Sequence, residues 1–465
     1  METVKGAIKQ VIKNTGANFL ALTAALSRVL RSLPGRIRPP KALPEPVKEF
    51  FGRIRKISAD KALWIWAVVI LGGGLLFRLI NGNLLGTHTT LVFAQWWEDE
   101  LGNQALVNLA AEFEAQNPGI TVKLEKMTWP EIRALFEVAE DAKKKKPDIF
   151  SVDPYAVSDL EAYIQPADSP IGGVQPVVSF INVLFYNIDL FKTVGFDRPP
   201  KNQTEFLSYV RRIGQENGGV YGAGLALGDN NPHSVNRHFL SWIWSALGNP
   251  SAESFSFNSP QVISVLNFLN QLKQNLYSDP FSLTEEELVN AFREGKVGMM
   301  IGPVANIRDL KTTMTKAFGI TTIPGIESYV RKPVFPLTVW YAGVNQQSEH
   351  REEALSFLSF LQEKDGIIAA EAYAVPGNGR RNPDLSKGDL LYAKAFDMYE
   401  AGEIVRELYD PKEAAELNSL ILRQIKLMFL DALTPEQCAE AIQRDWEKIA
   451  ENTASQDRPG HASAD

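Results

Sequence analysis

Cysteine is almost absent from this sequence of 465 residues, in which Cys438 stands alone. One cysteine excludes an intramolecular disulfide and any zinc site made of several cysteines. The chain also lacks a P-loop, a G-x-S-x-G motif and an H-E-x-x-H motif. Its five histidines are scattered, and we expect His233 and His238 at surface or capping positions. The sequence therefore predicts no enzyme activity, no metal site and no cofactor.

Net positive charge is confined to the amino-terminal segment 1–61. That segment holds 13 lysines and arginines and four acidic residues, a net charge of +9. The whole chain has a net charge of −7, so the rest of the chain carries −16. An acidic body argues against a general nucleic-acid binder, and the uneven charge predicts that the two parts of the chain lie in different places.

One long hydrophobic run separates these two parts. The segment 62–77 (ALWIWAVVILGGGLLF) contains no charge, and Arg78, Leu79 and Ile80 extend it to position 80. A helix over 62–80 spans about 28 Å, close to the roughly 30 Å hydrocarbon core of a bilayer. We predict a single transmembrane anchor at 62–80; the alternative is a buried helix of a soluble protein.

The flanking charges predict the orientation of this anchor. Four basic residues lie between positions 53 and 61, whereas none follows Arg78 until Lys123. Because positive flanks stay in the cytoplasm, the amino terminus should lie inside and the large body outside the cell membrane. The linker 81–89 has no A-x-A cleavage site, so we expect the anchor to stay uncleaved. The segment 1–61 would then be a basic cytoplasmic tail with a proline-rich linker.

The outer body, about 90–453, alternates between strand and helix patterns. Residues 90–97, 120–127 and 147–152 read as strands, and 105–116 and 131–145 as helices between them. This β-α-β-α-β order predicts an α/β fold with a mostly parallel sheet. In such sheets the loops after the carboxyl ends of the strands form the binding crevice.

Several segments resemble a known family when they are taken in order. They are LVFAQWW, NPGITVKLEKM, PDIFSVDPYAVSDLEAYIQP, VLFYNIDLFKTVGFDRPP and AFREGKVGMMIGP. Together they resemble the family 1 extracellular solute-binding proteins, the sugar-binding subunits of ABC importers. The resemblance covers about residues 90–450.

The resemblance implies a two-lobed, periplasmic-binding-protein-like (type II) fold with crossing hinge strands, here preceded by one transmembrane helix. Lobe 1 would comprise about 90–178 and 300–340, and lobe 2 about 183–299 and 345–453. One hinge would lie near 177–183. The polar tail 454–465 should be disordered.

Tryptophans fall where loops should line the cleft. Sugar binding needs aromatic rings against the C–H face and polar side chains for the hydroxyls. We predict ligand contacts from three aromatic pairs, Trp96 with Trp97, Trp242 with Trp244, and Trp340 with Tyr341. Adjacent strand residues point to opposite faces and helical residues two apart diverge, so one member of each of the first two pairs should face the ligand. Core packing is the alternative for each tryptophan.

Three polar residues complete the predicted site. Asp153 matches the family's ligand-binding aspartate, and a helix cap is the alternative role. The family has a polar residue on the hinge strand where this chain has Phe180, and Asn182 on the same strand face could substitute. Asn378 lies in a loop that resembles the family's late "lP.r" loop.

Residues and resemblance together predict a membrane-anchored protein that captures a carbohydrate between two lobes and delivers it to an ABC permease. Two alternatives stay open. The same fold could bind a polyamine, a peptide or an organic anion, and the acidic body would favour a cation. The outer body could also be the input module of a sensor or an adhesin, with the basic tail signalling inside.

Overall fold

The computed structural model describes most of the chain beyond residue 87. The described residues are 88–97, 101, 104–137, 146–153, 157–166, 173–228, 232–250, 254–326, 333–376, 388–405 and 411–456. The chain divides into two compact units, Met1–Gly86 and Thr87–Asp465, and the described residues all lie in the second. Among them, no helix has the length and apolar character needed to cross a membrane. The predicted tail 1–61 and anchor 62–80 lie outside the described residues.

A parallel sheet opens the described chain, as the sequence predicts. Strand β1 (Thr89–Gln95) lies between β2 (Ile120–Lys126) and β3 (Ile149–Val152), and it pairs in parallel with both. Helix α4 (Ala105–Gln116) connects β1 to β2, and α5 (Trp129–Glu137) connects β2 to β3. Leu106, Leu109 and Phe113 of α4 recur at helical spacing and are buried, which holds the helix on the sheet.

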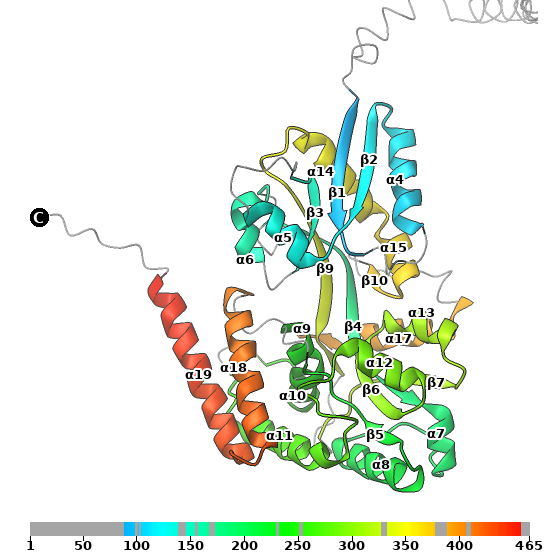
Figure 1. Cartoon of the computed structure of the whole chain (residues 1–465), viewed down its shortest axis with the longest axis vertical. Coiled ribbons are helices and arrows are strands. Elements are labelled where there is room, and N and C mark those ends of the chain that lie inside the picture. Colours follow the sequence, from blue (N-terminus) through cyan, green and yellow to red (C-terminus); the bar gives the residue numbers. More distant parts are fainter. Residues whose placement is uncertain are drawn as a thin grey trace, which may run out of the picture. The chain divides into compact units, whose positions relative to one another are not determined.

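Two long strands pass between two groups of strands (Figure 1). Strand β4 (Gln175–Asn187) pairs with β9 (Leu337–Val344) up to Ile181, and β9 also pairs with β3. From Asn182 onward β4 pairs instead with β6 (Val297–Pro303). We call the group β2-β1-β3-β9 with its helices the first lobe, and the group around β6 the second lobe. The change of partner falls within the segment 177–183 expected to be a hinge.

The strand partners differ from the expected lobe boundaries. The segment expected to return to the first lobe near residue 300 instead contains β6 and β7 (Phe318–Thr321), which both pair with the second-lobe end of β4. Helices α14 (Arg351–Glu363) and α15 (Asp365–Ala372) pack on the first lobe, where Phe357 contacts Phe93 of β1 at 6.1 Å between ring centroids. A strand pattern is the same in either sheet, so it cannot specify the partner.

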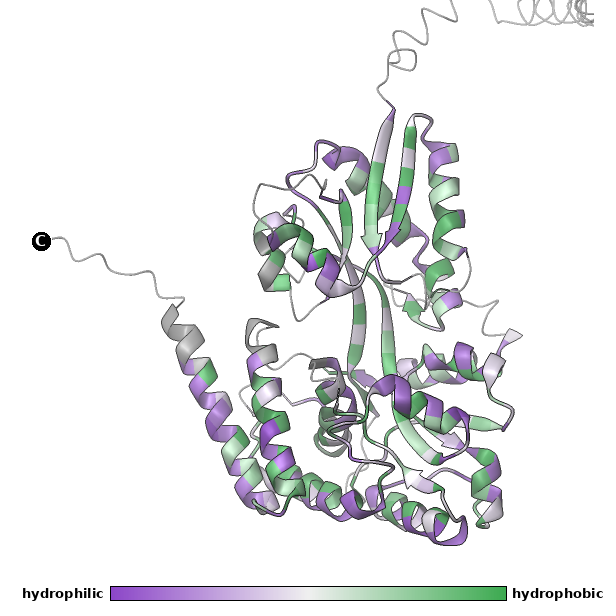
Figure 2. Cartoon of the chain, in the orientation of Figure 1, coloured by the Kyte–Doolittle hydropathy of each residue, from purple (hydrophilic) through white to green (hydrophobic). Residues whose placement is uncertain are grey.

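Helices enclose the strands of the second lobe. Strand β5 (Tyr221–Ala223) pairs with β6. The helices around these strands are α7 (Ile188–Thr193), α8 (Gln203–Glu216), α9 (Pro232–Val235), α10 (Ser241–Leu247), α11 (Pro260–Leu272), α12 (Glu285–Arg293), α18 (Pro411–Phe429) and α19 (Pro435–Gln456). Figure 2 shows hydrophobic and hydrophilic residues alternating along α18 and α19, which pack on each other. Leu417, Ile421 and Ile425 form the buried stripe of α18. Helix α19 extends to Gln456 and so enters the predicted disordered tail 454–465.

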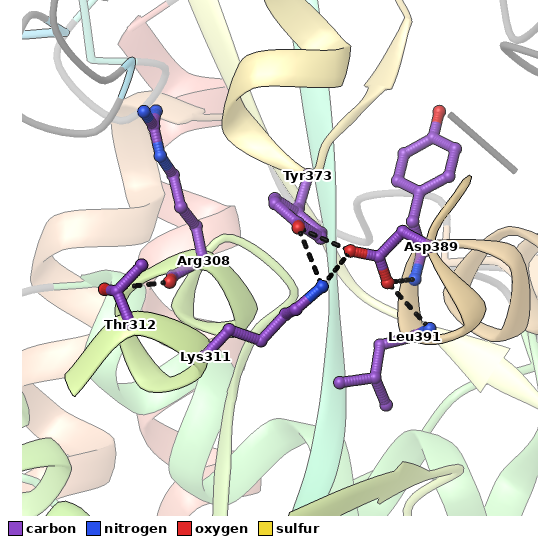
Figure 3. A network of polar contacts seen from close by, with 7 residues as sticks. Arg308, Lys311, Thr312, Tyr373, Asp389 and Leu391 are labelled. Atoms are coloured by element: carbon purple, nitrogen blue, oxygen red, sulfur yellow. Dashed lines mark hydrogen bonds and ion pairs between the residues drawn. The ribbon is translucent and has the colours of Figure 1, made fainter. Parts of the chain in front are cut away.

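A polar network joins three helices beside β4 (Figure 3). Asp389 caps α17 (Leu390–Ala401) by accepting hydrogen bonds from the N–H groups of Leu391 and Tyr392, at 2.9 and 3.2 Å. Its other oxygen accepts a 2.5 Å hydrogen bond from the Tyr373 hydroxyl and forms an ion pair with Lys311 of α13 (Asn306–Thr313). Burial opposes ionisation of Asp389, but these hydrogen bonds outweigh it and lower the pKa of the carboxyl.

We expect Asp389→Ala to lower the free energy of unfolding by about 2–4 kcal/mol, because it removes a helix cap and charge-assisted hydrogen bonds together. Asp389→Asn keeps the capping oxygen and should lose about half as much. The lowered pKa means that the stabilisation is fully present above the usual carboxyl pKa and is lost as pH falls through the lowered value. Urea denaturation at pH 7 and at low pH measures both effects. Equal stability of both variants and the wild-type chain would contradict this role.

Candidate functional site

A cavity of about 890 Å³ lies between the first and second lobes. The first lobe contributes residues that follow the carboxyl ends of β1, β2 and β3, as expected for a crevice in an α/β sheet. The strands β4 and β9 form its floor through Phe180 and residues 338–340. The second lobe contributes residues of α9, the π-helical turn Asn236–Leu240, α12, the end of β6 and the start of α13. We call this cavity the cleft.

Aromatic rings line the side of the cleft formed by the first lobe and the hinge strands. Trp96 and Trp129 are partly exposed and meet edge to face, with ring centroids 6.1 Å apart. Trp340 lies on β9 and meets Phe180 of β4 at 4.8 Å. The partly exposed rings of Trp96 and Trp129 offer flat apolar faces to a bound solute, whereas Trp340 is 6% exposed and has one face stacked on Trp97.

Charged groups line the second-lobe side. The guanidinium of Arg237 forms an ion pair with Glu285, and its Nε donates a 3.1 Å hydrogen bond to Oδ1 of Asn182. Only 8% of the Arg237 side chain is exposed, so these two partners compensate a charge that would otherwise be costly to bury. Arg293 forms a second ion pair, with Asp309 of α13. Both guanidinium groups therefore have a fixed carboxylate partner in the cleft wall.

A π-helical turn, Asn236–Leu240, presents two consecutive residues to the cleft, Arg237 and His238. Such turns are frequent at functional sites. Only 1% of His238 is exposed, and its Nε2 lies 3.6 Å from Oε1 of Glu285. Burial lowers the pKa of His238 well below its usual value, and the charge of Arg237 lowers it further. The ring is therefore neutral at physiological pH and can accept a hydrogen bond.

The sequence around Thr284 determines where helix α12 begins. The Thr284 hydroxyl accepts from the N–H of Glu287, whose carboxylate accepts from the N–H of Thr284, which makes a capping box. Leu288, Ala291 and Phe292 are buried, so the opposite face of the first turn is left for the cleft.

In the part of the chain that the structure describes, no three His, Cys, Asp or Glu side chains are placed to hold a metal ion.

One contact between cleft-lining residues joins the two lobes. Nε2 of His233, on α9, lies 2.9 Å from Oδ2 of Asp153, which follows β3. Each side chain is 22% exposed. Because the two residues belong to different lobes, their contact stabilises the approach of the lobes.

We expect Asp153→Ala and His233→Ala each to shift the unliganded lobes toward a wider opening, with no further shift in the double variant. The pair is partly exposed, so its coupling energy should be about 0.2–1 kcal/mol. Small-angle scattering of the compact unit 87–465 measures the opening as a larger radius of gyration. Two single effects that simply add in the double variant would show that the residues do not act as a pair.

The structure brings three of the predicted ligand residues to the cleft, namely Trp96, Asp153 and Trp340. Asn182 is 1% exposed and does not line the cleft, but it supports Arg237, which does. Asn378 lies outside the described residues. Trp96 thus faces the cleft while its neighbour Trp97 is buried in the core, although both residues lie just beyond the end of β1.

Four other predicted residues pack in the hydrophobic core, away from the cleft. They are Trp97, Trp242, Trp244 and Tyr341. Trp242 packs between Phe206 and Phe268, with centroids 4.9 and 4.8 Å away, and Trp244 packs against Phe255. Helix α10 is surrounded by other elements, so neither of its tryptophans reaches the cleft.

The sequence alone missed the charged wall of the cleft. His238 is buried, whereas we expected it at a surface or capping position. Arg237 and Glu285 lie far apart in the sequence and belong to no short motif. Trp129 also lines the cleft. Its position after a predicted strand could have indicated this, but it is not among the predicted ligand residues.

The comparisons with known proteins agree with this arrangement. The family model of the bacterial extracellular solute-binding proteins matches residues 97–367 of the chain. The chain belongs to this family. This solute-binding protein is 24% identical over 281 residues to a protein of Brucella abortus (strain 2308) named as a binding protein, a match that covers 54% of this chain and 67% of that one. It is 23% identical over 251 residues to a protein of Deinococcus radiodurans named as an ABC transporter-binding protein, covering 50% and 59%.

Solved structures share the two-lobed fold of this solute-binding protein. The GacH receptor of Streptomyces glaucescens, solved unliganded and with acarbose, has a TM-score of 0.62 and 17% identity, covering 78% of this chain and 99% of that one. Maltose-bound MalE3 of T. maritima has a TM-score of 0.63 and 18% identity, covering 78% and 100%. UgpB of Mycobacterium tuberculosis, in complex with glycerophosphocholine, has a TM-score of 0.64 and 14% identity, covering 78% and 99%. At these identities the likeness concerns the fold.

Proposed function

We propose that this extracellular solute-binding protein captures a carbohydrate in the cleft and delivers it to an ABC permease. The observation that carries the proposal is the pairing of an aromatic wall, Trp96, Trp129 and Trp340, with a hydrogen-bonding wall across the same cavity. A sugar ring has an apolar C–H face and a rim of hydroxyls, and these two walls suit its two surfaces. The cavity volume lies in the range of small-molecule sites.

The fold explains how capture could be signalled to a permease. The lobes are joined by β4 and β9, so a solute that contacts both lobes stabilises their approach. The pair Asp153 and His233 joins the two lobes and would add to the closed form. Two of the fold neighbours were solved with acarbose and with maltose, which supports a carbohydrate as the solute here.

A thermal-shift screen of the full chain against carbohydrates, polyamines, peptides and organic anions tests the proposal. A solute at about 100 times its dissociation constant adds about 2.7 kcal/mol of stability, which is readily detected. The proposal requires a clear shift with at least one carbohydrate. Shifts from a polyamine or a peptide alone would contradict it.

A non-carbohydrate solute is the second candidate, because of one specific departure. Phe180 lines the cleft where the family resemblance implies a polar residue on the hinge strand, and its ring cannot hydrogen-bond a sugar hydroxyl. UgpB, a fold neighbour, was solved with glycerophosphocholine. The same screen separates the two candidates.

We also propose that the hydrophobic run 62–80 anchors the protein in the cell membrane, with the solute-binding unit outside. The run is long enough to cross the hydrocarbon core as a helix, which supports the anchor. Its basic flank supports the orientation with the solute-binding unit outside. Deletion of the segment 62–80 should move the protein from the membrane pellet to the soluble fraction, while its replacement by a leucine and alanine segment of equal length should not. Pelleting of the deleted form in high salt and carbonate would contradict the anchor.

A further inference from the structure

The cleft wall carries more negative than positive charge. Its carboxylates are Asp153, Glu285, Glu286 and Asp309, and its guanidinium groups are Arg237 and Arg293. Each guanidinium forms an ion pair with one of these carboxylates, so neither adds net positive charge to the space. Glu286 is exposed toward the cleft and has no ion-pair partner among the described residues. A neutral solute would leave this excess uncompensated.

His238 gives an independent indication of a bound group. The ring lines the cleft, is 1% exposed, and neither of its nitrogens has a hydrogen-bond partner within the described part of the chain. A buried polar group without a partner is costly, so a bound solute that supplies a donor would gain affinity there. Burial keeps the ring neutral by lowering the pKa of His238, so one ring nitrogen has a free lone pair.

The helix dipole of α12 acts against a cation but is too weak to decide the matter. The amino terminus of a helix carries about half a positive charge. Glu286, in the first turn of α12, lines the cleft with a full negative charge and no ion-pair partner among the described residues, so its charge exceeds that half charge.

We propose that the solute is a carbohydrate bearing a protonated amine, whose ammonium group lies between Glu285, Glu286 and the ring of His238. The inference rests on the proposed carbohydrate function and names the substrate class of the same cleft. The ammonium donates to the two carboxylates and to the imidazole nitrogen, while the sugar ring lies against the indoles of the first lobe. Arg237 keeps Glu285 in place and remains paired with it.

Titration calorimetry of the full chain with two matched disaccharides tests the inference. The probes are cellobiose and the β-1,4-linked disaccharide of glucosamine, which differ in carrying a hydroxyl or an ammonium at position 2 of each ring. Spermidine is the third probe, as a cation without a sugar ring. We expect the amino disaccharide to bind at least about tenfold more tightly than cellobiose, with an affinity that falls as salt rises.

Two variants, one in the first turn of α12 and one just after its last residue, make the test specific. Glu286→Gln removes the charge at an exposed position, so the fold should be kept, and it should weaken the amino disaccharide about five- to tenfold with less than a twofold effect on cellobiose. Glu294→Gln removes the same charge just beyond the other end of α12, outside the cleft lining, and should leave both affinities unchanged.

The outcomes separate this inference from the proposed function. Equal or tighter binding of cellobiose overturns the ammonium proposal while carbohydrate binding stands. Equal losses in Glu286→Gln and Glu294→Gln, or no binding of the amino disaccharide, also overturn it. Binding of spermidine with no binding of either disaccharide, together with a screen that finds no carbohydrate, overturns the proposed function itself.

Discussion

Replacement of Trp97 by alanine should lower the free energy of unfolding by about 3–5 kcal/mol, the usual cost of removing a large buried aromatic ring. Trp97 is fully buried. Its ring stacks on Trp340, with centroids 5.3 Å apart and planes within 6°, and meets the edge of Phe93 at 5.6 Å. The cavity left by alanine would lie beneath Trp340, which lines the cleft. Urea denaturation followed by circular dichroism measures the loss.

The neighbouring residue provides a matched control. Trp96 is only partly buried and faces the cleft, so Trp96→Ala should cost less than about 1.5 kcal/mol of stability. It should instead weaken carbohydrate binding about tenfold or more, because a ring that covers the sugar face is lost. The reverse pattern, with Trp96→Ala unstable and Trp97→Ala stable, would show that the strand faces are assigned the wrong way round.

Arg237→Met should be the second large effect, at about 2–3 kcal/mol of stability, less than for a fully buried pair because the Glu285 side chain is 31% exposed. Removing one partner of a buried ion pair leaves the other charge uncompensated, and this costs more than the pair itself contributes. Here Glu285 would lose its guanidinium and Asn182 would lose the donor to its Oδ1. The double variant Arg237→Met/Glu285→Met should recover at least half of the loss.

Comparison of the single and double variants decides whether the pair is coupled. Denaturation of the two single variants and the double variant gives the coupling energy directly. A double variant as unstable as the sum of the two single changes would contradict a coupled pair. In that case Arg237 would stabilise the second lobe through packing alone.

Local elements could be predicted from the sequence because they depend on local patterns. The helix 105–116 was predicted with the bounds that α4 has, since its apolar residues recur at helical spacing and its flanks do not continue the pattern. The order of strands and helices from β1 to β3 is likewise confirmed. The partners of β6, β7 and β9 could not be predicted, because strand pairing depends on contacts between segments far apart in the chain.

In the cleft, too, positions that depend on neighbouring residues could be predicted, whereas contacts between distant segments could not. Only Trp96 of the pair Trp96 and Trp97 lines the cleft, as expected from the sequence, although both residues follow the end of β1. The prediction failed for Trp242 and Trp244, because α10 is covered on all sides by elements that its own sequence does not reveal. The ion pair between Arg237 and Glu285 could not be predicted from the sequence either, because it joins a π-helical turn to the start of a helix far along the chain.

Hydrogen–deuterium exchange with and without a bound carbohydrate tests the central claim most directly. A solute held between the lobes should slow exchange in two segments at once, residues 128–132 of the first lobe and 285–293 of the second, which both border the cleft. Protection confined to one lobe, or to the outer groove between α8 and α11, would contradict a solute clamped in the cleft.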